Sequence, residues 1–132
     1  HPGCLRSGPE MVAGATRLAA GTLQKVALNT LSTGIMVRLG RVYGGRVVSM
    51  RSSNQKLRRR AAAMVAGLCG VTAEEGLQVV ERAEGDIRLA SLLALGAGEA
   101  AARDALLATD GNLREALANL RRDGLLVRDF RV

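Results

Sequence analysis

The stretch from Gly8 to Gly40 constrains the fold most, because it predicts one long helix that is apolar on most sides. A turn rich in glycine, proline and small hydroxyl residues comes first, and the helix is expected from about Thr16 to Leu39. Apolar residues recur in it at three- and four-residue spacing. We expect such a helix to be buried, with partners for the hydroxyl and amide groups that it carries.

Composition bounds what the rest of the chain can do. The chain has 132 residues, of which 48% are apolar, but Tyr43 and Phe130 are its only aromatic residues. A core of leucine, valine and alanine is therefore expected, in one domain or two small ones. Proteins that bind single-stranded nucleic acid by stacking need aromatic side chains, so this composition argues against that class.

Charge is divided unevenly along the chain. Residues 1–60 hold eleven Lys and Arg and a single acid, Glu10, whereas residues 61–132 hold eight Arg and eleven acids. This asymmetry predicts two segments with different surroundings. The basic half suits an anionic ligand, acidic groups of another subunit or nucleic acid.

The two cysteines, Cys4 and Cys69, are far apart and lack the spacing of metal ligands. Two free thiols in a reducing compartment are the favoured interpretation. No stretch has the length of a membrane span or the pattern of a signal peptide, so the cytoplasm is the expected location. Because the chain does not begin with Met, we expect it to be a fragment.

One short strand is expected after the long helix. Gly44-Gly45 predicts a turn, and residues 46–50 (RVVSM) follow as the strand. A lone strand cannot form a sheet, so we expect its partner to lie outside this sequence.

Short helices fill the remainder. A helix is expected from Ser52–Asn54 to about Cys69, and Thr72 to Glu75 form a capping box for the next. Residues 83–90 (AEGDIRLA) match residues 109–116 (TDGNLREA), so Asp86 and Asn112 are predicted to cap two equivalent helices. The repeat resembles ubiquitin-associated-type helical bundles, although any compact pair of helical hairpins would show the same pattern.

Four residues are candidates for ligand binding. Glu10 follows a Gly-Pro turn amid cations and should be ionised and well hydrogen-bonded. Thr16 and Arg17 lie at the expected helix N-terminus, where backbone N–H groups favour anions. Lys25 shares one helix face with Asn29 and Ser32, a face expected at a site, an interface or solvent.

The Gly8–Gly44 region resembles the signature of the N-acetylmuramic acid 6-phosphate etherases, a branch of the sugar isomerase superfamily of sugar-phosphate-binding proteins. The matching positions are Gly8-Pro9-Glu10, Gly14, Thr16-Arg17, Ala20-Gly21-Thr22, Gln24-Lys25, Leu28-Asn29, Ser32-Thr33-Gly34 and Arg38. Ala15 and Ala19 depart from it, because the family usually has Ser and Lys there.

The resemblance implies an α/β fold. Residues 1–70 would form the C-terminal half of a three-layer α-β-α sugar isomerase domain, residues 71–120 a small helical bundle, and residues 121–132 a tail. It also implies a cytoplasmic homodimer without metal or organic cofactor, membrane or nucleic acid. The glutamates credited with catalysis would lie upstream, so no catalytic residue is expected here, while Glu10, Thr16, Arg17 and Lys25 would bind substrate.

The implied reaction removes the D-lactyl ether from N-acetylmuramic acid 6-phosphate, giving N-acetylglucosamine 6-phosphate and D-lactate. The isolated chain is expected to be inactive. Two alternatives remain open: a non-catalytic regulator that binds sugar phosphates, favoured by Ala15 and Ala19, and a basic helical protein that binds nucleic acid.

Overall fold

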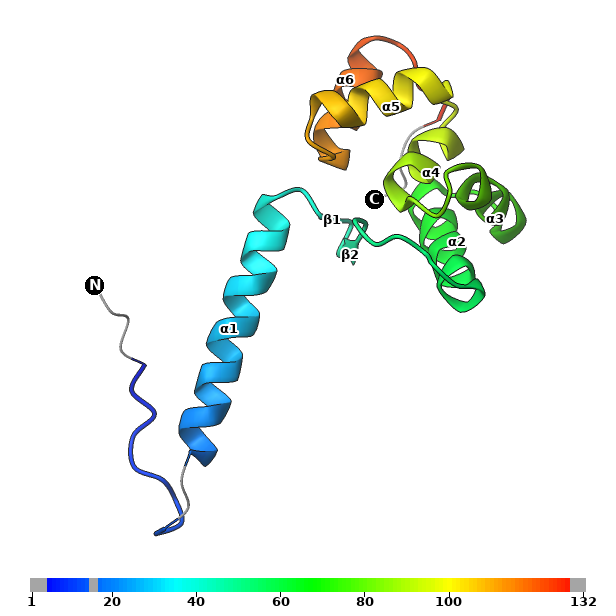
Figure 1. Cartoon of the computed structure of the whole chain (residues 1–132). Helices are drawn as coiled ribbons and strands as arrows, with labels where there is room; N and C mark the ends of the chain where they lie inside the picture. The colour runs from blue at the N-terminus through cyan, green and yellow to red at the C-terminus, as the bar shows by residue number, and fades with distance from the viewer. Residues whose placement is uncertain (1–4, 15–16, 129–132) are drawn as a thin grey trace. The chain divides into compact units, whose positions relative to one another are not determined.

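The computed structural model describes residues 5–14 and 17–128 as two compact units, residues 1–38 and residues 39–132. The first unit contains helix α1, Leu18–Arg38 (Figure 1). The second contains a hairpin and five helices: β1 (Val42–Tyr43), β2 (Arg46–Val47), α2 (Gln55–Cys69), α3 (Ala73–Arg82), α4 (Ile87–Ala94), α5 (Glu99–Ala108) and α6 (Leu113–Arg122).

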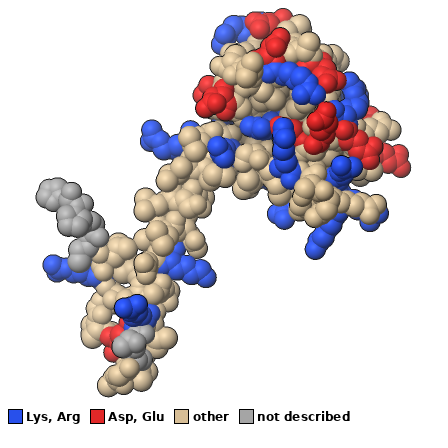
Figure 2. Space-filling view, in the orientation of Figure 1, with Lys and Arg blue, Asp and Glu red and all other residues tan. Residues whose placement is uncertain are grey.

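Helix α1 agrees with the expected span to within two residues, but it has no buried residue. Most of its large apolar residues, among them Leu18, Leu28 and Leu31, are more than half exposed, and most of its surface carries no charge (Figure 2). The expectation that this helix is buried is therefore not met by the described part of the chain. The exposed residues lie on several sides of the helix, so no single apolar face forms.

The predicted strand has a partner within the chain. Val42 pairs with Val47 and Tyr43 with Arg46 in an antiparallel hairpin, and Val48 N–H donates to the Arg41 carbonyl at 3.0 Å. The prediction of a lone strand was wrong, because Val42-Tyr43 forms the first strand before the Gly44-Gly45 turn. Both glycines have positive φ, which this tight two-residue turn requires. The three-layer α-β-α arrangement is not seen in this two-stranded sheet.

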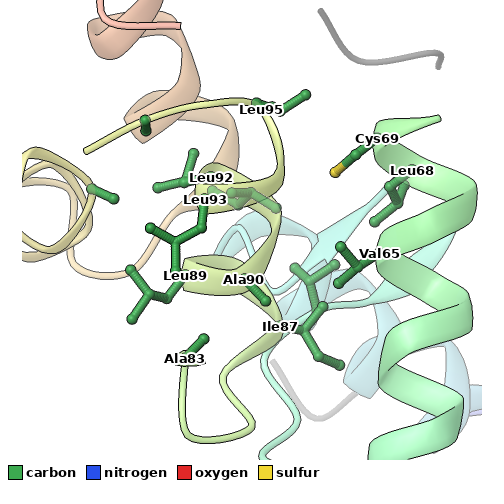
Figure 3. Close-up of a cluster of buried hydrophobic side chains, with 14 of the residues drawn as sticks. Val65, Leu68, Cys69, Ala83, Ile87, Leu89, Ala90, Leu92, Leu93 and Leu95 are labelled. Atoms are coloured by element: carbon green, nitrogen blue, oxygen red, sulfur yellow. The ribbon is translucent and has the colours of Figure 1, made fainter. Parts of the chain in front are cut away.

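The buried core belongs to the second unit. Figure 3 shows side chains of α2, among them Val65, Leu68 and Cys69, facing Ile87 and its neighbours on α4. Helix α2 packs most extensively against α3 and also contacts α4. The first compact unit ends at Arg38, and α2 shares its core with the later helices of the second unit.

The expected helix caps are present. Asn54 caps α2, Thr72 and Glu75 form the capping box of α3, and Asp86 and Asn112 cap α4 and α6 with their side-chain oxygens. After α6 the tail turns back, so that the Val127 and Arg128 N–H groups donate to the Leu95 carbonyl at 2.9 and 3.1 Å.

The Cys69 thiol is buried and lies 3.5 Å from the Ser91 carbonyl oxygen, to which it donates. Burial raises the pKa of Cys69 to about 12. It is a free cysteine, as expected, whereas Cys4 lies outside the described residues.

Close approach of α2 and α3 depends on Gly76. A Cβ atom at this position would lie 2.7 Å from the Ala62 carbonyl oxygen, which is backbone and cannot swing aside. We therefore expect Gly76→Ala to lower the free energy of unfolding by about 2 kcal/mol, as overpacking does. Thermal unfolding followed by circular dichroism measures the change.

The control is Gly67→Ala on the facing helix. Its Cβ would meet only the Arg46 guanidinium, at 3.1 Å, and that flexible group can move. Because alanine favours helix by up to about 1 kcal/mol over glycine, Gly67→Ala should be neutral or stabilising. Equal destabilisation by both substitutions would contradict the close-approach argument.

Asp86 is the ionised counterpart of Asn112. Burial alone would raise the pKa of Asp86, but the Arg88 guanidinium at 2.8 Å and the N–H groups of Arg88 and Leu89 outweigh burial and lower it. A carboxylate with a lowered pKa stabilises the fold above its unfolded pKa, and this contribution disappears as pH falls through its folded pKa.

We expect Asp86→Asn to keep the cap, as Asn112 does, and to be destabilised less than Asp86→Ala, which loses about 1–2 kcal/mol with the cap. The stability difference between wild type and Asp86→Asn should shrink as pH falls below about 4. Urea unfolding at pH 7 and at acid pH tests this, and a constant difference would show that the ion pair contributes nothing.

Candidate functional site

The start of α1 is closed by a carboxylate from the preceding loop. Glu10 Oε2 accepts a hydrogen bond from Ala19 N–H at 2.9 Å, and Oε1 accepts from Ala19 and Ala20 N–H at 3.2 and 3.3 Å. The first N–H groups of a helix have no partner within it, and the dipole makes this end positive. The predicted hydrogen bonding of Glu10 is thus confirmed, and its partners are the helix's own N–H groups.

Arg17 lies immediately before α1, and its backbone carbonyl accepts the first hydrogen bond of the helix. Its φ of 70° is left-handed, which is uncommon for a residue with a side chain, and its carbonyl accepts the Gly21 N–H at 2.8 Å. The residue is exposed. Thr16, the neighbouring candidate, lies outside the described residues.

A hollow of about 750 Å³ lies between the loop that carries Glu10 and the first turns of α1. Its lining is mostly apolar, with Glu10 and Arg6 as its charged members. The lining residues are Arg6, Ser7, Glu10, Met11, Val12, Leu18, Ala19, Thr22, Leu23 and Val26. Small-molecule sites often combine an apolar wall with a few polar groups in this way.

The candidate residues are only partly brought together. Glu10 lines the hollow, whereas Arg17 and Lys25 do not. Lys25 lies on α1 with Asn29 and Ser32, all three exposed, so their predicted common face points to solvent within the described unit.

Sequence reasoning missed Arg6 and the N–H groups of Ala19 and Ala20. Every residue type except proline has a backbone N–H, so the sequence does not show which amides donate to Glu10. The available signal was an isolated acid shortly before the start of a helix, which can accept from the first amides of that helix. Arg6 lies in an irregular loop, and the sequence of that loop does not indicate where its side chain lies.

The described part of the chain offers no group of three His, Cys, Asp or Glu placed to hold a metal ion. Among the same residues, no single helix is long and apolar enough to cross a membrane; α2 and α3, bent by 114°, meet the length and composition criteria only as a pair.

Comparison with known proteins places the chain among etherases. It is 46% identical over 121 residues to the N-acetylmuramic acid 6-phosphate etherase of Trichormus variabilis, 47% identical over 115 residues to that of Synechococcus sp., and 46% identical over 114 residues to that of Streptomyces avermitilis. These matches cover 91%, 86% and 85% of the chain. No protein-family profile matches it.

By this similarity the chain belongs to the family of N-acetylmuramic acid 6-phosphate etherases, of which it represents a part. The match covers 39% of the Trichormus variabilis protein and 36% of each of the other two. The chain thus spans well under half the length of the relatives that it matches.

Removal of the Glu10 carboxylate should open the start of α1. We expect Glu10→Ala to speed hydrogen exchange at the Ala19 and Ala20 amides by about fivefold, since a lost cap costs about 1 kcal/mol. Glu10→Gln keeps an acceptor oxygen and should have a smaller effect. Exchange followed by NMR measures both.

The Leu57 amide, which donates to Asn54 at the start of α2, serves as the internal control and should not change. Unaltered exchange at Ala19 and Ala20 in Glu10→Ala would show that Glu10 does not cap α1.

Proposed function

We propose that this chain is part of an enzyme that cleaves the D-lactyl ether of N-acetylmuramic acid 6-phosphate, yielding N-acetylglucosamine 6-phosphate and D-lactate. The observation that carries the proposal is identity of 46–47% across more than 85% of the chain to etherases of that name. The enzyme would be a cytoplasmic homodimer that binds a sugar phosphate and neither nucleic acid nor membrane.

The proposed role of this chain is to supply one wall of the substrate pocket. In support, Glu10 lines a mostly apolar hollow beside the helix N-terminus, and the helix amides hold its carboxylate in place there. A sugar presents hydroxyl groups that a carboxylate binds well, whereas Thr16, Arg17 and Lys25 offer donors suited to phosphate or lactyl carboxylate oxygens.

Elimination of an ether requires a base for the proton beside a carbonyl and an acid for the leaving oxygen. Glu10 is the single acid in residues 1–60, and its carboxylate already accepts bonds from two amides. We therefore propose that the acid and base come from another part of the enzyme, and that residues 1–132 alone are inactive.

A regulator that binds sugar phosphate without turnover is the second candidate. It is favoured by Ala15 and Ala19, which replace the Ser and Lys usual in the family and so remove a hydroxyl and an ammonium group. The backbone N–H of Ala19 donates to the Glu10 carboxylate, and this hydrogen bond does not depend on the side chain at position 19.

The test is release of D-lactate from N-acetylmuramic acid 6-phosphate by the longer gene product that contains this sequence. We expect release by that protein and none by residues 1–132. Release by the short chain would refute its proposed dependence on other parts, whereas sugar-phosphate binding without release by the long protein would establish the regulator.

Glu10→Gln in the long protein separates binding from folding. If Glu10 contacts substrate, kcat/KM should fall about tenfold or more while the melting temperature changes little, because a charged hydrogen bond to substrate is lost. Glu99→Gln, at an exposed carboxylate on α5, is the matched control and should leave kcat/KM unchanged. An unaltered kcat/KM in Glu10→Gln would show that Glu10 caps α1 but does not contact the substrate.

A further inference from the structure

The two copies of the internal repeat build the same loop. In the first, Glu84 and Gly85 have positive φ and Asp86 caps α4; in the second, Asp110 and Gly111 have positive φ and Asn112 caps α6. The residue after each cap, Ile87 or Leu113, is fully buried. Each loop is thus fixed to the core by the buried residue that follows its cap.

The first loop binds the end of the segment that follows the hairpin. Ser52 donates to the Gly85 carbonyl from its N–H at 3.2 Å and from its hydroxyl at 3.3 Å. Arg51 forms an antiparallel bridge with Asp86. Ser52 is buried, and a Cβ at Gly85 would lie 2.9 Å from the Ser52 carbonyl oxygen, so glycine is needed for this approach.

The second loop binds the segment that precedes the hairpin. The Asn112 side chain lies against Gly40, with Oδ1 2.6 Å from the place that a Cβ would occupy. Two residues further on, the Arg114 guanidinium lies 5.2 Å from the centroid of the Tyr43 ring, a cation–π contact. Tyr43 also packs against the buried core.

Arg88 links the two loops. Its guanidinium pairs with Asp86 at 2.8 Å and donates to the Gly111 carbonyl at 3.4 Å. This side chain is three-quarters buried, and its pKa is raised by the hydrogen bonds to Asp86. One charged side chain therefore contacts both loops.

We propose that the tandem repeat is a clamp, in which the Gly-Asp loop holds Arg51–Ser52, the Gly-Asn loop holds Gly40 and Tyr43, and the hairpin between them is positioned from both ends. The clamp sets the direction of a hairpin that carries Arg41 and Arg46. In the clamp, Arg88, Asn112 and Arg114 are residues that position the hairpin. The clamp does not depend on the proposed etherase function.

Tyr43 gives a direct readout. The chain has one tyrosine and no tryptophan, so tyrosine fluorescence reports the hairpin alone. In Arg114→Gln, the loss of the covering guanidinium should raise the acrylamide quenching constant of Tyr43 about twofold. The melting temperature of the helices should stay within about 2 °C, because Arg114 lies outside the core.

Arg103→Gln is the matched control, because Arg103 is an exposed arginine on α5 that pairs with Glu99 and not with the hairpin. It should leave Tyr43 quenching unchanged. If Arg114→Gln also leaves quenching unchanged, or if quenching rises only together with loss of the helical melting transition, the clamp is refuted.

The opposite end is tested with Ser52→Pro, which removes the N–H that donates to Gly85, against Ser52→Ala, which keeps it. Exchange at the Val48 amide, bonded to the Arg41 carbonyl across the hairpin, should quicken about tenfold in the proline variant and remain near wild type in the alanine variant. Equal Val48 protection in both, with the fold intact by circular dichroism, would overturn the role of the first loop.

Discussion

The structure of the second unit depends on one small motif, a left-handed pair of residues followed by a capping side chain. The pair reverses the chain after α3 and again after α5, and the cap satisfies the first N–H groups of the next helix. Because the residue after each cap is fully buried, the turn and the core are fixed together. The second left-handed position is occupied by Gly85 or Gly111, and glycine adopts this conformation without steric cost. The first is occupied by Glu84 or Asp110, whose side chains make the same conformation strained.

Much of this unit could be predicted from the sequence. Caps at Asn54, Thr72, Asp86 and Asn112 are determined by local chemistry, so their positions followed from residue type and spacing. The hairpin partner was missed because Val42-Tyr43 is too short to show period-two alternation. The buried face of α2 is evident in the sequence, but which helices cover it depends on long-range packing, which the sequence pattern does not show.

The candidate site was predicted in part. Glu10 was expected to be hydrogen-bonded because it stands alone among cations, and this is confirmed. Its partners could not be predicted, since donors at Ala19 and Ala20 belong to the backbone. The apolar hollow beside Glu10 could not be predicted either, because it depends on how the Gly-Pro loop folds back along α1. The family resemblance grouped Lys25 with Glu10 as a substrate-binding residue, and Lys25 lies outside the residues that line the hollow.

The closed start of α1 restricts how an anionic ligand can bind there. The amides that would hold a phosphate already donate to Glu10, and a second anion beside that carboxylate would be repelled. If the proposed sugar phosphate binds in this hollow, it would have to displace Glu10 from the amides, or place its phosphate elsewhere and offer hydroxyls to the carboxylate. The second arrangement would keep the cap, and it would leave the anion to donors such as Arg6, which lines the same hollow. A carboxylate already held by two amides cannot swing freely, so it suits orientation of a hydroxyl-rich ligand better than proton transfer.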